Sequence, residues 1–372
     1  MSYERWARVE VDLEAVRRNV RALKGRTEPG TLFMAVVKAD GYGHGALPVA
    51  RAALAAGADR LGVATVDEAV TLREAGITAT IQLLSEPPAS AVDLIIEHGV
   101  VPAVTTRAFA GALGRAGAAR GIDTPYHLKI DTGMNRIGVP AGEAHEFAAA
   151  IDSFPGLQLE GTMTHFATAD VPGDWDFEMQ LERFTSALAR MRDEGIDPGI
   201  VHAANSPATI LHPEAHFDMV RCGIALYGLH PSRDTYGEIE LAPAMSVIAR
   251  VTFVKKVGMG EGVSYGLTWR AVAPTTIATL PLGYADGVHR VLSNNMEVLI
   301  GGARCAQVGR VCMDQFMVEV PRGVTVDEGD EAVLVGAQGA ESILLDDLAE
   351  RAGTINYEMA CAFGMRMPRV YR

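Results

Sequence analysis

The sequence has little cysteine, less positive than negative charge, and no long apolar run. Its four cysteines, Cys222, Cys305, Cys312 and Cys361, form no CxxC pair. This spacing is typical of reduced thiols in a cytoplasmic protein, rather than of a disulfide framework or a zinc site. We therefore expect a cytoplasmic location and no metal.

The charge balance and the hydropathy exclude two classes of partner. Lysine and arginine number 33 against 46 aspartates and glutamates, which gives a net charge of −13. Because like charges repel, we expect no binding to nucleic acid or to an anionic membrane surface. No stretch is long and apolar enough to span a bilayer, and the N-terminal MSYERWARVEVDLEAVRRN has no apolar signal core.

The first two thirds of the chain alternate between β-rich and helical patterns. A length of 372 residues favours two domains. The predicted strands are LFMAVVK, RLGVA, TIQLL, VVPAV, YHLKI, GTMTHF, IVHAA and DMVRC, and amphipathic, alanine-rich segments separate most of them. Eight such units predict a TIM-like (β/α)8 barrel over residues 11–235. An open doubly wound sheet is the alternative, but no GxGxxG follows the first strand.

The last third changes texture. Strand-like runs such as AMSVIARVTFVKKV, TTIATLPLGY and EAVLVG alternate with glycine-rich turns, and LLDDLAERAG is the segment with a helical pattern. We predict a mainly β domain over residues 236–372, joined by residues 1–10, where RVEVDL provides a strand. The fold class is therefore α/β plus β.

The stretch AVVKADGYGHG ends an apolar strand on Lys38 and continues into a glycine-rich loop. The lysine either caps the strand and points to water, or is a reactive amine at the mouth of a site. In a β/α barrel, chemistry collects at the carboxyl ends of the strands. The predicted strand ends also carry Lys129, with Arg136 just beyond, His165 and Arg221. Each has an ordinary explanation alone, but their gathering at one rim indicates a functional cluster.

The cluster suits an aldehyde cofactor. A lysine amine forms a Schiff base with such a group, and pyridoxal 5'-phosphate is the common one. Ser206 begins a helical segment, and Gly223 and Ile224 lie in a tight turn, so the Ser206 hydroxyl and the nearby backbone N–H groups could bind a phosphate. Arg221 could face the pyridine nitrogen. These residues do not by themselves name a reaction.

The sequence resembles the alanine racemase family. AVVKADGYGHG, HLKIDTGMNRIG, THFATAD, HAANSPATILHP, MVRCGIALYG, SYGLTWRA, LPLGYADG, GRVCMDQFMVEV and NYEMACAFGMRMPRVY are similar to that family's successive motifs, in order and over nearly the whole chain. The resemblance implies a barrel that binds pyridoxal 5'-phosphate, alanine as the small-molecule substrate, and a homodimer with shared active sites. Such an enzyme supplies D-alanine for cell-wall peptidoglycan.

The resemblance also implies roles for particular residues. Lys38 and Tyr265 resemble the two catalytic bases, with Tyr265 acting from the partner subunit. The cofactor-binding positions are Lys38, Tyr42, His165, Asn205, Ser206, Arg221, Gly223, Ile224 and Tyr357; the substrate-carboxylate positions are Arg136 and Met313; the supporting positions are Lys129, Tyr284, Cys312 and Asp314. Lys129 matches a position that is carbamylated in many members. Gly41 departs from the expected alanine in the KADxYGHG motif.

Two other reactions stay open on the same fold. A broad-specificity amino-acid racemase is the closest alternative. A pyridoxal-phosphate-dependent decarboxylase would present a carboxylate, not Arg221, to the ring nitrogen. A non-catalytic cofactor carrier of the single-barrel type would lack the region from 240 to 372.

Overall fold

The computed structural model describes residues 5–372, which divide into two compact units. The barrel unit comprises Glu14–Gly41 and Ala46–Ala242. The C-terminal unit comprises Pro243–Arg372 together with Tyr42–Gly45 and the segment that ends at Leu13. The fold confirms the predicted barrel and mainly β architecture.

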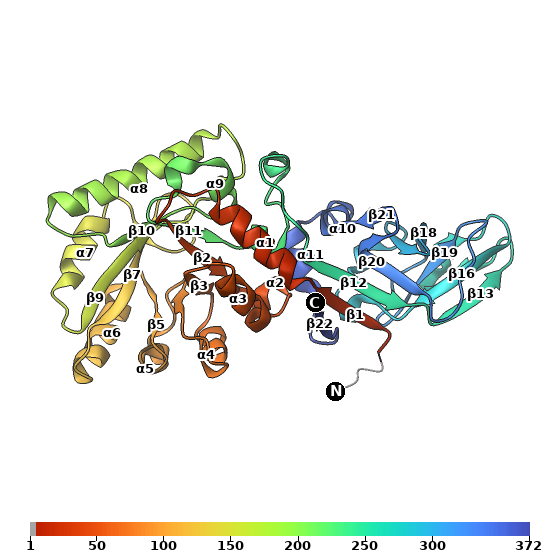
Figure 1. Cartoon of the computed structure of the whole chain (residues 1–372), viewed down its shortest axis with the longest axis horizontal. Coiled ribbons are helices and arrows are strands. Elements are labelled where there is room, and N and C mark those ends of the chain that lie inside the picture. The colour runs from red at the N-terminus through yellow and green to blue at the C-terminus, as the bar shows by residue number, and fades with distance from the viewer. Residues whose placement is uncertain (1–4) are drawn as a thin grey trace. The chain divides into compact units, whose positions relative to one another are not determined.

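The barrel unit contains parallel strands that close on themselves, with helices outside them (Figure 1). β2 pairs with β3 and β11, and β7 with β9, while backbone bonds from Asp218 N to Val201 O (3.0 Å) and from Arg221 N to Ala204 O (2.9 Å) join β10 to β11. The strands are β2 Leu32–Val36, β3 Arg60–Val63, β4 Thr80–Leu83, β5 Val100–Val101, β6 Ala103–Val104, β7 Thr124–Asp131, β9 Leu157–Met163, β10 Ile200–His202 and β11 Met219–Cys222; β8 Val139–Pro140 pairs with β7.

The run VVPAV forms two short strands because Pro102 interrupts it. Proline has no N–H to donate to a ladder. β5 pairs with β4 on one side, and β6 pairs with β7 on the other. This position in the barrel therefore joins its two sheets.

The barrel's helices bury one face, and α4, α6, α8 and α9 begin at a side-chain cap. Thr65 caps α4 through a capping box with Glu68, and Thr106 accepts from Phe109 N at the start of α6. The helices are α1 Leu13–Lys24, α3 Ala46–Ala55, α4 Val66–Glu74, α5 Val92–Glu97, α6 Arg107–Ala119, α7 Ala144–Asp152, α8 Trp175–Asp193 and α9 Ser206–Leu211. Among residues 5–372, no helix combines the length and the apolar character needed to cross a membrane.

The C-terminal unit is built on a mostly antiparallel sheet in which Phe316, Val318 and Val320 alternate buried with less buried neighbours. β1 joins it, pairing antiparallel with β12 and parallel with β22, which confirms the predicted N-terminal strand. The strands are β1 Ala7–Val11, β12 Met245–Arg250, β13 Phe253–Val257, β16 Thr275–Leu280, β17 Glu297–Ile300, β18 Ala303–Val308, β19 Phe316–Val320, β20 Glu331–Gln338, β21 Glu341–Ile343 and β22 Arg369–Tyr371; β14 Gly262–Val263 and β15 Trp269–Arg270 form a separate pair.

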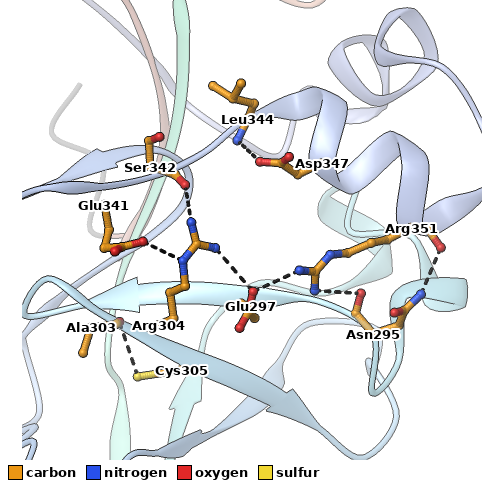
Figure 2. Close-up of polar contacts among 10 residues, drawn as sticks. All are labelled: Asn295, Glu297, Ala303, Arg304, Cys305, Glu341, Ser342, Leu344, Asp347 and Arg351. Carbon is orange, nitrogen blue, oxygen red and sulfur yellow. Dashed lines mark hydrogen bonds and ion pairs between the residues drawn. The ribbon is translucent and has the colours of Figure 1, made fainter.

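The helix α10 (Leu345–Ala352) is held to the sheet by a network of ion pairs (Figure 2). Arg304 contacts Glu341 at 2.6 Å and Glu297 at 3.3 Å, and Arg351 of α10 contacts Glu297 at 3.0 Å. Exposed pairs of this kind contribute about 0–1 kcal/mol each, so the network fixes geometry more than it stabilises. A second helix, α11 (Asn356–Ala362), was not expected from the helical pattern, and the prediction of one helix in this region is wrong.

Candidate active site

Lys38 lies at the carboxyl end of β2, at the start of a left-handed turn. Val37 N donates to Gly62 O (2.8 Å), so pairing with the β3 strand reaches the residue before Lys38. Ala39, Asp40 and Gly41 then have φ angles of 53°, 50° and 61°. The strand is therefore shorter than LFMAVVK predicts. The half-buried Lys38 lies on a turn, not within a ladder.

Two carboxylates hold this turn. Ala39 N donates to Glu68 Oε1 (2.7 Å), and Ala46 N donates to Asp40 Oδ1 (2.9 Å). Glu68 also accepts from Thr65 N at the start of α4, so it links that helix to the residue after Lys38. A left-handed turn of L-residues is costly, and these bonds compensate for it.

Gly41 suits this turn better than the alanine that the resemblance leads us to expect there. Its φ of +61° is free of strain for glycine alone. A Cβ at this position would lie 3.2 Å from both the backbone N and the Cα of Ala46. The departure from the family motif therefore removes strain from the loop that bears Tyr42.

Arg221 is buried at the centre of the barrel's polar cluster. Its Nη2 donates to Thr164 O and Ala203 O, both at 2.8 Å, and to His165 Nδ1 at 3.2 Å. Its Nη1 donates to His202 Nδ1 at 3.0 Å. Burial lowers the pKa of Arg221 to about 10, so the guanidinium stays charged at neutral pH.

His165 must be neutral in this arrangement. Its Nδ1 faces a donor that has no lone pair to offer, so the ring accepts there. Burial, followed by the charge of Arg221, lowers the pKa of His165 well below its ordinary value. The geometry and the electrostatics therefore give the same protonation state.

Lys129 lies in the same cluster, and the pKa of its amine is lower than usual. Nζ donates to Leu84 O at 2.7 Å, and the residue is 4% exposed. Burial lowers the pKa of Lys129 to about 7, with further lowering by Arg221, Arg136 and Lys38 and an opposing effect of Asp131. Lys129 and His165 also line a small pocket with Arg136, which follows β7.

Ser206, Gly223 and Ile224 meet at the start of α9. Asn205 caps this helix by accepting from Ala208 N (3.2 Å). The Ser206 hydroxyl accepts from Gly223 N at 2.9 Å and Ala225 N at 3.4 Å. Ile224 begins the next short turn and is buried. The predicted phosphate-binding residues of the barrel unit are therefore neighbours.

In the C-terminal unit, two loops carry four of the predicted residues. Tyr284 N donates to Cys312 O, and Ala285 N donates to Met313 O, both at 3.0 Å. The loops approach so closely that a Cβ on the intervening Gly283 would overlap the Met313 backbone. Asp314 forms an ion pair with Arg366 at 2.7 Å. Tyr284 and Met313 are 43% and 52% exposed, so their side chains remain accessible in the chain.

Tyr265 is 73% exposed and begins a short turn after Ser264. Ser264 Oγ donates to Arg310 O (2.6 Å) and lies 3.4 Å from Cys312 Sγ, which joins this turn to the Met313 loop. Tyr42 and Tyr357 also belong to this unit, with ring centroids 6.3 Å apart.

The barrel cluster suits pyridoxal 5'-phosphate. Arg221, Arg136 and Lys38 all depress the pKa of Lys129, which shows an excess of positive charge at one rim. Such a rim favours the anionic phosphate and a substrate carboxylate. Lys38 supplies an amine for the aldehyde, and Ser206 supplies a hydroxyl beside backbone N–H groups. The residues therefore match the cofactor's groups in kind.

The chain folds into a parallel β/α barrel and a mainly β unit. Lys38 lies on a turn at the end of a barrel strand, and cationic side chains cluster at the same rim. Together these features define a class of cofactor-dependent barrel enzymes. Residues 11–231 match the family model described as alanine racemase, N-terminal domain, and residues 244–371 match alanine racemase, C-terminal domain. The chain belongs to the alanine racemase family.

Individual relatives match the chain over nearly their full length. The chain is 48% identical to the alanine racemase of Symbiobacterium thermophilum, covering 98% of this chain and 96% of that protein, and 44% identical to that of Desulfovibrio desulfuricans, covering 100% and 99%. The crystal structure of alanine racemase from Bacillus anthracis with bound L-Ala-P has a TM-score of 0.94 and 40% identity, covering 100% of this chain and 96% of that one.

Three residues that support the predicted site residues were not predicted from the sequence. Glu68 was not predicted, although its place three residues after Thr65 is a capping-box signal. Thr164 contributes a backbone carbonyl, which leaves no signal in the sequence. His202 lies within the predicted strand IVHAA, but its bond to Arg221 depends on pairing between strands.

Proposed function

We propose that the protein interconverts L-alanine and D-alanine with two bases and pyridoxal 5'-phosphate. Membership of the alanine racemase family supports this proposal. The single observation that carries it is the position of Lys38, on a fixed turn at the barrel rim and within electrostatic reach of Lys129.

The cofactor would be held mainly by the barrel, residues 11–235. Lys38 would bind the aldehyde carbon, Arg221 would face the ring nitrogen, and His165 would lie beside the ring. The phosphate would be bound by Tyr42, Ser206, Gly223, Ile224 and Tyr357, and Asn205 would be a further cofactor-binding residue. When bound, the cofactor supplies an electron sink for the substrate's α-carbon. Arg221 would limit the strength of that sink, because a guanidinium does not readily give up a proton.

Racemisation needs one base on each face of the α-carbon, because one fixed side chain cannot reach both faces. Lys38 would take or return the proton on its own face once the substrate amine has displaced it. Tyr265 of the partner subunit, from the domain over residues 236–372 and 1–10, would do so on the other face. The active unit would then be a homodimer with shared active sites.

The substrate would be a small amino acid. Arg136 and the backbone N–H of Met313 would bind its carboxylate. Bulk from Tyr284, Tyr357 and Met313 would leave room for about a methyl group, although one methylene changes discrimination by only about 1–3 kcal/mol. Cys312 and Asp314 would support the Met313 loop. In a cytoplasmic setting, the product would supply D-alanine for cell-wall peptidoglycan.

The test is to incubate the purified protein with L-alanine, L-serine and L-lysine and measure each D-product. We expect D-alanine to form fastest. Comparable rates on all three would favour the broad-specificity racemase, and carbon dioxide release without a D-product would favour the decarboxylase. No product from L-alanine with cofactor present would contradict the proposal.

A further inference from the structure

A series of hydrogen-bonded polar groups runs through the barrel from Arg221 to Arg60; Arg221, His202 and His127 are buried, and Glu160 and Arg60 are half-buried. Arg221 Nη1 contacts His202 Nδ1 at 3.0 Å, and His202 Nε2 contacts His127 Nδ1 at 2.7 Å. His127 Nε2 contacts Glu160 Oε2 at 3.0 Å, and Glu160 pairs with both terminal nitrogens of Arg60 at 3.0 and 3.2 Å. The groups come from β11, β10, β7, β9 and β3 in turn.

Arg221 at one end of this series and the Glu160 carboxylate near the other determine the direction of every hydrogen bond between them. Arg221 can only donate, so His202 Nδ1 accepts. A carboxylate can only accept, so His127 Nε2 donates to Glu160. His127 Nδ1 must then accept, and His202 Nε2–H donates to it. Both rings therefore carry their proton on Nε2, and reversing either ring would place two donors or two acceptors face to face.

Burial keeps the two imidazole rings of this series in these protonation states. His127 and His202 are fully buried, and burial lowers the pKa of each, so neither ring gains a second proton near neutrality. The bond from His127, followed by the bonds from Arg60, lowers the pKa of Glu160 to about 2. The carboxylate is therefore ionised throughout the working range of an enzyme.

The backbone leaves room for this arrangement at one residue. A Cβ on Gly161 would lie 2.6 Å from His127 Nδ1, so only glycine leaves space for the imidazole ring beside Glu160. The His127 and His202 rings meet edge to face with centroids 4.8 Å apart. The packing leaves the two rings little freedom to rotate. The directions of the hydrogen bonds are therefore fixed by this packing as well as by Arg221 and Glu160.

We infer that Glu160 is a positioning residue: through His127 it holds His202 in the Nε2–H form, and His202 thereby holds the Arg221 guanidinium in place. Arg221 Nη2 has carbonyl acceptors, whereas Nη1 donates to His202 Nδ1 among the described residues. The inference rests on the proposed function, because Arg221 affects the reaction only where it faces the cofactor ring.

A charge swap tests the inference directly. The double variant Arg60→Glu/Glu160→Arg keeps a pair of opposite charges but presents a donor to His127, which reverses both rings and turns His202 Nδ1–H toward Arg221. The control Arg60→Met/Glu160→Gln removes both charges but keeps an acceptor for His127. Nitrogen-15 NMR of ring-labelled histidine reads the tautomers of the cofactor-loaded protein without reference to activity.

We expect Nε2–H signals for the His127 and His202 rings in the wild type and the control, and Nδ1–H signals for both rings in the swap. The swap should lower kcat for alanine about tenfold or more relative to the control, and change KM less, because one contact to a charged group is lost. The absorption spectrum of the bound cofactor should shift only in the swap. If the swap does not fold, His127→Leu cuts the same connection. The same loss is then expected relative to the control Thr162→Val, which removes a buried hydrogen bond from β9, the strand that carries Glu160.

An Nδ1–H signal from either buried ring of the wild type would overturn the inference. So would reversed tautomers with kcat and spectrum equal to those of the control. These outcomes differ from failure of the proposed function, in which the wild type makes no D-alanine although the tautomers are as expected.

Discussion

Single residues decide the charge state of the site. Lys129 is the clearest case, because burial and three neighbouring cations bring its pKa down to about 7. A lysine with its pKa near 7 is partly neutral at physiological pH, and a neutral amine can attack carbon dioxide. The new N–C bond forms a carbamate and releases a proton. The resulting anion would offset the positive charge that Arg136 and Arg221 contribute.

We predict that Lys129 forms such a carbamate. Wild-type protein equilibrated with carbon-13 bicarbonate should show a carbamate signal by NMR, and Lys129→Arg, which stays charged, should not. Lys129→Arg should also lower racemase activity, because a cation replaces an anion beside Arg136. A signal of equal size in both proteins would assign it to another amine.

The same residue should affect stability with pH. In carbon-dioxide-free buffer, the unfolded state binds the Lys129 proton up to about pH 10.4, whereas the folded state releases it above about pH 7. The unfolded state thus binds more protons between these values, and stability rises with pH across the window. Lys129→Met should remove this contribution, stabilising the protein most below pH 7. Urea unfolding at pH 6.5 and pH 9 measures the difference.

At the scale of elements, the turn after β2 couples a helix start to Lys38, the proposed catalytic residue. Glu68 accepts from Thr65 N within the cap of α4 and from Ala39 N beside Lys38. Glu68→Ala should therefore lower both stability, by about 1–2 kcal/mol, and kcat. Thr65→Ala removes the cap but not the contact to Ala39, so it should cost similar stability with activity retained. Equal kcat in the two variants would show that Glu68 acts on the helix alone.

Gly41 gives a second test of the turn. Gly41→Ala should destabilise the protein by about 1–2 kcal/mol, because the left-handed conformation is strained for alanine and the new methyl group meets Ala46. Gly30→Ala is the matched control, since Gly30 also has a positive φ (+99°) but open space around it. Guanidinium unfolding should show a larger loss for Gly41→Ala. Activity should persist, because no functional group is removed.

The sequence predicted which helices and strands form more accurately than where each one begins and ends or which residues come into contact. Apolar strands and three-to-four-residue periodicity are local, and the barrel follows from them. The left-handed turn at Ala39 and Asp40 has no local signal, since both residues prefer other conformations, so the strand was predicted to reach Lys38. The seven-residue α11 was too short to show a period. His127 and Glu160 meet through pairing of β7 with β9, which a linear pattern does not contain.

At the scale of the whole molecule, the proposed dimer has a direct test. Lys38→Ala and Tyr265→Ala should each be nearly inactive. Co-expressed with different tags and purified as mixed dimers, they should regain part of the activity, because one site then holds both wild-type bases and the other holds neither. A verified mixed dimer without racemase activity would show that the two bases do not act across subunits.

The pairing of β1 with β22 has a mechanical consequence. These parallel strands carry the two ends of the described chain, and Arg372 N–Val11 O and Leu13 N–Arg372 O bonds of 3.0 Å join them. A force applied at residues 5 and 372 would pull the strands in opposite directions along their length, loading several bonds at once. Tension would therefore pass through this clamp while the intervening barrel sequence carried none. Optical-trap stretching should show one high-force event before any barrel extension, and Val9→Pro, which removes the bond to Pro368 O, should lower that force.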